Sequence, residues 1–223
     1  MKRLVIYCHL GLGDAIICNA IVRDRASRYD RVVYFCKHHN HPSVKFMFRD
    51  LPNVWVVQAS DDADAERFLS DRAKSEEVLR LGGTGDNFVG AEFDKSFYRQ
   101  AGVPFEHRWD RWSVLRGSTE LRAPCFTDTK YAFIHSDPAR GFNVDPFKLP
   151  SRVECEWVEP NKTENIFEWW SIIENAEEIH VINSSFLHFI DSIPTKAKRH
   201  VLHKYARPQG EYPTLRKDWK ILT

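Results

Sequence analysis

Residues 4–19, LVIYCHLGLGDAIICN, constrain the fold of this chain more than any other stretch. An apolar run ends in a turn that contains Gly11 and Gly13, and an apolar helical pattern with Asp14 in its first turn follows at once. A buried strand, a glycine turn and a helix form the repeating unit of open α/β sheets, whose ligands bind at the carboxyl ends of the strands. We therefore expect a site at this turn, where Asp14 is the only ionised side chain.

The same alternation of short apolar runs and helical patterns predicts the fold class. Strands are expected at 4–8, 31–36, 53–58, 77–81, 131–135, 152–157, 178–182 and 200–203, and further helices at 41–50, 61–73, 93–101, 165–175 and 184–193. Strands that alternate with helices imply parallel sheets with right-handed crossovers. The rhythm breaks at 103–129, which indicates a connection. The prediction is two Rossmann-like βα domains, 1–115 and 116–223, that face a ligand cleft.

Composition and charge limit the cellular compartment and the binding partners that we expect. The net charge of +1 points to no particular partner, and no nucleic-acid-binding motif is present. Five scattered cysteines favour buried free thiols in a reducing compartment. No apolar run approaches the ~20 residues of a membrane span, and no signal peptide is evident. We expect a cytoplasmic protein. Its basic tail, residues 196–220, is either a solvated face or a contact for an anionic substrate or a membrane surface.

The glycine turn departs from the dinucleotide-binding fingerprint. Ile16 stands where G-x-G-x-x-G needs its third glycine, and no acidic residue closes the second strand. A nicotinamide cofactor is therefore disfavoured, and no other cofactor is expected. Asp14 keeps two interpretations, a functional carboxylate or an acid that only stabilises the start of its helix.

Two polar segments follow strands in the second half. Asn183, Ser184 and Ser185 begin a helix, with His188 one turn further on, and Arg140 lies in a loop after the strand at 131–135. A helix N-terminus with serine hydroxyls suits a phosphate, and arginine pairs with diphosphates. The alternatives are an ordinary serine cap, a core histidine and a surface arginine.

The segment at 36–41 contains possible metal ligands. Cys36, His38, His39 and His41 match no standard zinc spacing. A solvated loop is favoured over a metal site.

Three of these segments together resemble the ADP-heptose heptosyltransferase family. The opening L-G-L-G-D-A-I resembles that family's S-x-G-D-x-x motif, and Asn183–His188 resembles its D-[ST]-G-x-x-H motif. The strand and basic loop at 134–140 resemble the start of its nucleotide-binding half. The resemblance implies a GT-B architecture of two facing Rossmann-like domains.

The resemblance also implies roles. Asp14 matches a catalytic base that deprotonates an acceptor hydroxyl, with Gly11 and Gly13 leaving room for a sugar. Arg140 and the helix start Asn183, Ser184, Ser185 and His188 match groups around the donor diphosphate, without a metal ion. The implied activity is transfer of a sugar from a nucleotide-diphosphate-sugar donor to a glycan or glycolipid acceptor.

The sequence departs from the family pattern at the second of these motifs. Asn183 replaces the motif's aspartate and Ser185 its glycine, and the chain is about a third shorter than a usual member. These departures favour an alternative, a non-catalytic nucleotide- or sugar-binding protein on the same fold.

Overall fold

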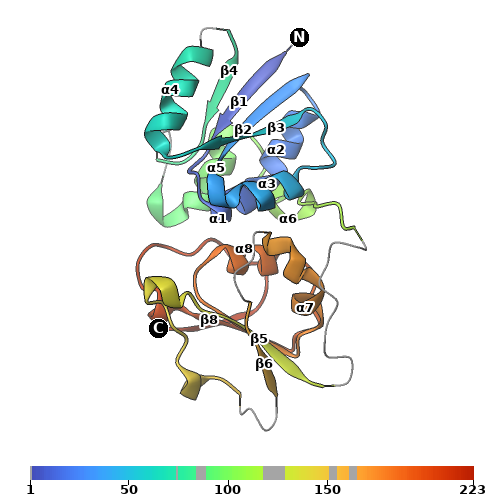
Figure 1. Ribbon diagram of the computed structural model, residues 1–223, viewed down its shortest axis with the longest axis vertical. Helices are drawn as coiled ribbons and strands as arrows, with labels where there is room; N and C mark the ends of the chain where they lie inside the picture. The colour runs from blue at the N-terminus through green and yellow to red at the C-terminus, as the bar shows by residue number, and fades with distance from the viewer. Residues whose placement is uncertain (1, 74, 84–88, 118–128, 151–154, 161–164) are drawn as a thin grey trace. The chain divides into compact units, whose positions relative to one another are not determined.

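The computed structural model describes residues 2–73, 75–83, 89–117, 129–150, 155–160 and 165–223. The chain divides into two compact units, Met1–Arg116 (unit 1) and Gly117–Thr223 (unit 2), and each contains its own sheet (Figure 1). Every strand pairing is parallel. The prediction of an α/β fold with two parallel sheets is thus confirmed. None of the described helices is long and apolar enough to cross a membrane.

The sheet of unit 1 has the strand order β3-β2-β1-β4. Its central strands are nearly continuous apolar runs that are buried on both faces, as parallel strands between helices must be. Helix α4 covers one face, where its Ala65 and Leu69 pack on Val33 and Phe35 (Figure 1). Tyr34 packs against Phe48 on the opposite face. The bounds are β1 Arg3–Tyr7, β2 Arg31–Lys37, β3 Val54–Ala59, β4 Glu77–Arg80, α1 Leu12–Ile17, α2 Asn19–Ala26, α3 His41–Met47, α4 Asp62–Arg72, α5 Phe93–Ala101 and α6 His107–Asp110, with 3₁₀ turns η1 His38–Asn40 and η2 Gly90–Glu92.

The first helical pattern forms two helices, because the chain breaks at Cys18 between α1 and α2. The buried Asn19 side chain then donates to the Ser113 carbonyl at 3.1 Å and accepts from the Ser113 N–H at 3.0 Å. This two-point contact ties residue 113 back onto α2. The Cys18 and Cys8 sulfur atoms lie 3.6 Å apart in the core.

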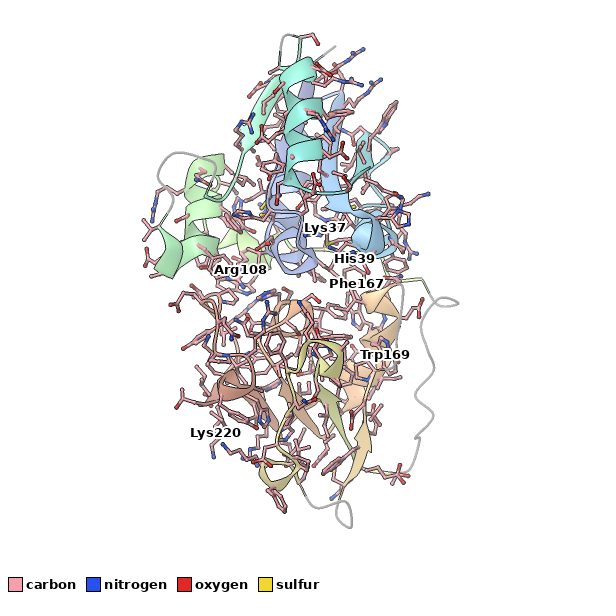
Figure 2. The ribbon with its side chains drawn as sticks, turned by 60° about the vertical axis from the view of Figure 1, so that its left-hand side comes forward. Lys37, His39, Arg108, Phe167, Trp169 and Lys220 are labelled. Carbon is pink, nitrogen blue, oxygen red and sulfur yellow. The ribbon has the colours of Figure 1, made fainter. Side chains whose placement is uncertain are left out.

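The segment 103–129 was expected to be a connection, and its described part contains a short helix that the sequence analysis did not predict. Helix α6 forms there, and its Arg108 is buried and paired with Asp94 of α5 (Figure 2). Four helical residues are too few to leave a 3.6-residue pattern in the sequence, so periodicity alone does not reveal them.

The sheet of unit 2 has the order β6-β5-β7-β8-β9. Aromatic residues fill its core: Phe167 and Trp169 of η5, both labelled in Figure 2, pack on Phe189 and Phe133 at ring-centroid distances of 4.9 and 6.3 Å. The bounds are β5 Tyr131–His135, β6 Glu156–Val158, β7 Glu178–Val181, β8 Arg199–His203, β9 Trp219–Leu222, α7 Trp170–Asn175 and α8 Ser185–Ser192, with 3₁₀ turns η3 Pro138–Arg140, η4 Pro146–Lys148, η5 Ile166–Trp169 and η6 Lys204–Ala206.

The prediction that 200–203 forms the final strand is wrong, because β9 follows it and pairs with β8. The buried carboxylate of Asp191 on α8 holds the chain in place for this pairing. It accepts from the N–H groups of Arg216 and Lys217 and, at 2.9 Å, from the Trp219 indole N–H. The basic tail therefore contains regular structure. Of the strand expected at 152–157, residues 152–154 lie outside the described residues, and β6 begins at Glu156.

Candidate functional site

Asp14 lies at the third position of α1, directly after the carboxyl end of β1. Gly11, not Asp14, is the N-cap of this helix, and Gly13 is its second residue. A Cβ atom at residue 11 would lie only 2.7 Å from Asp14 Oδ2, so a side chain there would displace the carboxylate. Gly11 thus makes room for the Asp14 side chain itself.

Burial raises the pKa of Asp14 to about 6, and the opposing influence of nearby His9 is smaller. No hydrogen bond to the carboxylate is found among the described residues. A carboxyl group with a pKa of about 6 is mostly ionised at neutral pH and is a stronger base than an ordinary carboxylate, so it can accept a proton from a substrate. This property distinguishes Asp14 from an ordinary helix-capping acid, which is exposed and fully ionised.

The side chains of His9 and Gln100 join the strand ends around Asp14 by binding the backbone of Gly82 and Gly83. The Gly83 N–H donates to His9 Nε2 at 3.3 Å, and Gln100 of α5 both donates to and accepts from the Gly82 backbone. Gly82 has a φ of +92°, and a Cβ there would lie 2.5 Å from His9 Nε2. The chain after β4 therefore needs glycine to hold His9 beside Asp14. The sequence analysis did not identify the part that His9 takes in this contact.

In unit 2, Ser184 is the N-cap of α8 but does not cap the helix with its side chain. Its hydroxyl instead lies 3.2 Å from Nδ1 of His135, the last residue of β5. Burial lowers the pKa of His135 to about 4, so this imidazole is neutral at physiological pH. The Leu187 N–H donates to the Ser184 carbonyl at 3.0 Å, and the N–H groups of Ser185 and Phe186 are left for another acceptor. Ser185 opens the helix, whereas His188 is buried within it.

Arg140 lies in a compact loop closed by the Asp137–Phe142 bridge. Its guanidinium pairs with Asp137 and lies 5.7 Å from the centre of the Phe142 ring. The guanidinium of Arg207 lies 5.4 Å from the same ring. Burial and the charge of Arg140 both lower the pKa of Arg207. Two guanidinium groups thus share one aromatic ring.

Hydrogen bonds join these loops at the carboxyl edge of the unit 2 sheet. Arg207 donates to the Asn183 carbonyl at 2.6 Å, and the Asn183 amide donates to the Glu211 carbonyl at 3.1 Å. The segments after β5, β7 and β8 therefore meet at the start of α8. We call this set of residues the arginine cluster: His135, Arg140, Phe142, Asn183, Ser184, Ser185 and Arg207. Of these, Arg140, Asn183, Ser184 and Ser185 were predicted from the sequence. Arg207 was missed as a site residue, although its place after the strand at 200–203 was a signal.

A buried chain of hydrogen bonds crosses unit 2 beside this cluster. His180 Nε2 lies 3.0 Å from the Glu178 carboxylate, and His180 Nδ1 lies 3.0 Å from His203 Nε2. His203 Nδ1 is 2.9 Å from the Tyr205 hydroxyl, which accepts from the Asp145 N–H. A carboxylate only accepts, so His180 Nε2–H donates to Glu178, His203 Nε2–H donates to His180 Nδ1, and the Tyr205 hydroxyl donates to His203 Nδ1. In this arrangement each imidazole carries one proton and is neutral. Burial lowers the pKa of both histidines, that of His203 to about 4.

No cluster of three or more metal-ligating side chains occurs within the described parts of the chain. The residues at 36–41 engage other groups: His38 lies 2.5 Å from the Gln58 side-chain oxygen, and Cys36 is buried. Lys37, the last residue of β2, and His39 of η1 are labelled in Figure 2.

Comparison with known proteins adds a likeness in fold. No protein-family model matches the sequence, and no curated protein matches it. Among solved structures, the chain is similar to TibC, a bacterial iron-containing dodecameric glycosyltransferase from enterotoxigenic E. coli H10407, with a TM-score of 0.55 at 14% identity over 96% of this chain. A second structure, the heptosyltransferase TibC in complex with ADP-D-β-D-heptose, has a TM-score of 0.55 at 13% identity over the same share.

This chain has the Rossmann-like fold of these glycosyltransferases. It spans 61% of the length of the TibC chains it matches. At this identity the likeness concerns the fold, and an activity has to be argued from the site.

Proposed function

We propose that this protein is a glycosyltransferase that moves a sugar from a nucleotide-diphosphate-sugar donor to a hydroxyl of a glycan or glycolipid acceptor. The arginine cluster of unit 2 carries the proposal. It gathers a helix N-terminus, a serine hydroxyl and two guanidinium groups at the carboxyl ends of parallel strands. These groups suit a diphosphate in charge and in hydrogen-bonding capacity.

In the proposed division of labour, unit 2 binds the donor and unit 1 activates the acceptor. Asp14 takes the proton of the acceptor hydroxyl, whose oxygen forms a bond to the anomeric carbon of the sugar. The bond from that carbon to the diphosphate breaks, and the electron pair leaves with the nucleoside diphosphate. Arg207, Arg140 and the N–H groups at the start of α8 stabilise the charge that develops there, so the proposed step uses protein groups in place of a metal ion.

The likeness to TibC and the raised pKa of Asp14 both support this proposal. TibC, which shares the fold, is described as a heptosyltransferase and has been solved with ADP-D-β-D-heptose. The pKa of about 6 at Asp14 matches the need of a general base that works near neutral pH. The basic tail, which includes the half-buried Arg207, is the proposed place for contact with an anionic acceptor or a membrane surface.

The test compares the Asp14→Asn variant with the Asp64→Asn variant. Asp64 is a matched control because it is also the third residue of its helix, but its side chain is 40% exposed and pairs with Arg67. Turnover of a nucleotide-sugar panel with a glycan acceptor, measured with EDTA present, should fall about 100-fold or more in Asp14→Asn. Donor affinity by calorimetry should stay the same, and Asp64→Asn should behave like the unchanged protein. Normal turnover in Asp14→Asn would remove Asp14 as the base.

A second candidate function is nucleotide or sugar binding without transfer. The replacement of the motif's aspartate and glycine by Asn183 and Ser185 favours it. Tight binding of a nucleotide sugar by the unchanged protein, with neither hydrolysis nor transfer over a broad acceptor panel, would support this function over catalysis.

A further inference from the structure

A groove of about 480 Å³ lies in unit 1, away from Asp14. It runs between helix α3 and strand β3, which is an edge strand of the sheet. The neighbours of Asp14 and the arginine cluster take no part in its walls. Its lining comprises His41, Lys45, Phe48, Arg49, Leu51, Pro52, Val54, Trp55, Val56 and Val57.

The groove follows the open edge of β3. Residues 54–57 are consecutive in the strand and all line it. Successive side chains of a strand point to opposite faces, so a single groove that contacts four in a row has to run along the edge, where it meets the backbone.

The peptide groups of β3 alternate in direction. The Val32 N–H of β2 donates to the Asn53 carbonyl at 2.9 Å, so by alternation the backbone of Val56 points away from β2. The Val56 backbone influences the pKa of His41 on α3, so the two groups are near each other, which agrees with this orientation. The outward peptide groups of β3 therefore face the groove.

The walls of the groove combine apolar and cationic side chains. Leu51, Val54 and Val56 give it an apolar surface, and every ionisable side chain in the lining is basic: His41, Lys45 and Arg49. Trp55 is 51% exposed at the rim, and the Arg31 guanidinium lies 3.9 Å from the centre of its ring. A large exposed aromatic residue beside an open strand edge is a common feature of peptide-binding surfaces.

We propose that this groove binds an extended acidic segment of a partner protein, which adds to the β3 edge as a further strand. Backbone hydrogen bonds to the edge would supply affinity, and Lys45 would select carboxylate side chains over basic ones. The Arg49 guanidinium, which already donates to the Leu115 carbonyl at 2.8 Å, would add positive charge to the groove. At about 3.4 Å per residue, the length of β3 accommodates roughly five peptide residues. This binding role goes beyond the proposed sugar transfer and does not depend on it.

The test uses a fluorescein-labelled eight-residue peptide that alternates valine and glutamate, and fluorescence anisotropy as the readout. Two peptides serve as controls: one with lysine in place of glutamate, and one N-methylated at every second residue, which cannot pair as a strand. The acidic peptide should bind with micromolar affinity that weakens as salt is added. Both control peptides should bind at least tenfold more weakly.

Two variants locate the binding to the groove. Lys45→Glu should weaken the acidic peptide about tenfold or more, and the matched control Lys220→Glu on β9 of unit 2 should not (Figure 2). Val56→Pro removes an outward N–H and should also abolish binding, provided that circular dichroism shows an unchanged fold.

Several results would overturn the proposal. They are equal binding of the acidic and lysine peptides, equal binding of the N-methylated peptide, and no effect of Lys45→Glu. Failure of the peptide to bind, together with concentration-dependent dimerisation that Val56→Pro abolishes, would identify a second copy of this chain as the occupant instead. Because the readout contains no nucleotide sugar, failure here would leave the proposed transferase activity unaffected.

Discussion

Asp14 carries a buried carboxyl group whose charge opposes folding. Its pKa in the folded chain is about 6, above the ordinary value of 3.8, so the folded state holds this proton more tightly than the unfolded state does. The stability that this difference provides is fully present below pH 3.8 and is lost as the pH rises through 6. A residue that is costly when ionised, in a strand-end turn, is typical of a functional site.

Asp14→Asn should therefore stabilise the protein at pH 7.5, by up to about 3 kcal/mol from a shift of this size. The gain should vanish near pH 4, where both forms are uncharged. Urea denaturation at the two pH values measures this, and Asp64→Asn should show no such gain at pH 7.5, because the Asp64 carboxylate is 40% exposed and pairs with Arg67. A gain of equal size at both pH values would contradict the electrostatic explanation.

The two arginines of the arginine cluster should contribute unequally to anion binding. Asp137 already pairs with the Arg140 side chain, which is 58% exposed. Arg207 is more buried, and the charge of Arg140 helps to lower its pKa, so a bound anion would relieve repulsion there. With ADP as the ligand in calorimetry, Arg207→Met should weaken binding about tenfold or more, and Arg140→Met only a few-fold. Arg216→Met, at an exposed position in the same tail, should have no effect.

The candidate site residues were predicted from the sequence by a single rule, that ligands bind at the carboxyl ends of parallel strands. Asp14, Arg140 and Ser184 were all found in this way. Arg207 was not, because its contact with Asn183 joins residues 24 positions apart, which no local pattern records. The burial that raises the pKa of Asp14 is likewise a property of packing and not of spacing.

Among the elements, β9 depends on one side chain from another element. The Asp191 carboxylate accepts hydrogen bonds from three donors in residues 216–219, which lie at or just before the start of β9, the strand that pairs with β8. Parallel strands need a crossover between them, and the described connection from β8 to β9 contains no α-helix. Asp191 thus provides the anchor that a packed helix usually supplies.

Asp191→Ala should leave three donors without this acceptor, among them the buried Trp219 indole N–H, and cost about 3 kcal/mol in unfolding free energy. Hydrogen exchange followed by mass spectrometry should show lost protection at 219–222, while β5 and β7 keep theirs. Asp218→Ala, which removes an exposed neighbouring carboxylate, should change neither. Retained protection of β9 in Asp191→Ala would show that strand pairing alone holds it.

Elements with an uninterrupted pattern were predicted well, and those without one were not. The bounds of α5 and β5 agree with the expectation to the residue. β9 was missed because two of its four residues are exposed and Lys220 interrupts the apolar run. The helix expected at 165–175 exists as η5 followed by α7, a distinction that side-chain periodicity does not carry.

For the whole molecule, the two units should respond in opposite ways to mild acid. Burial lowers the pKa of four histidines in unit 2: His135, His200 and His203 to about 4, and His180 in the same direction. A lowered histidine pKa means that stability is lost as the pH falls below the unfolded value of 6.5. In unit 1, Asp14 contributes more stability over the same range, while His41, whose pKa burial also lowers, acts in the opposite direction to Asp14.

Between pH 7 and pH 5, unit 2 should therefore lose stability relative to unit 1. Hydrogen exchange, corrected for its intrinsic pH dependence, should show β7 and β8 losing protection while β1 and β2 keep theirs. His203→Gln should reduce the acid sensitivity of unit 2, although removal of one hydrogen bond lowers its stability at pH 7. Equal loss of protection in both units would contradict this assignment. The sequence predicted two parallel sheets, but it gave no sign that buried histidines gather in one of them.

The alkylation rates of the buried cysteines would measure how often each unit opens. Burial raises the pKa of Cys36 to about 12 and also raises those of Cys8 and Cys155, so these groups are poorly reactive while the chain is folded. An alkylating reagent would reach them only during transient opening. Among the described residues, Cys8, Cys18 and Cys36 belong to unit 1 and Cys155 to unit 2. With Cys125, which lies outside the described residues, changed to serine, the rate of modification at each site would time the two units separately within one intact molecule.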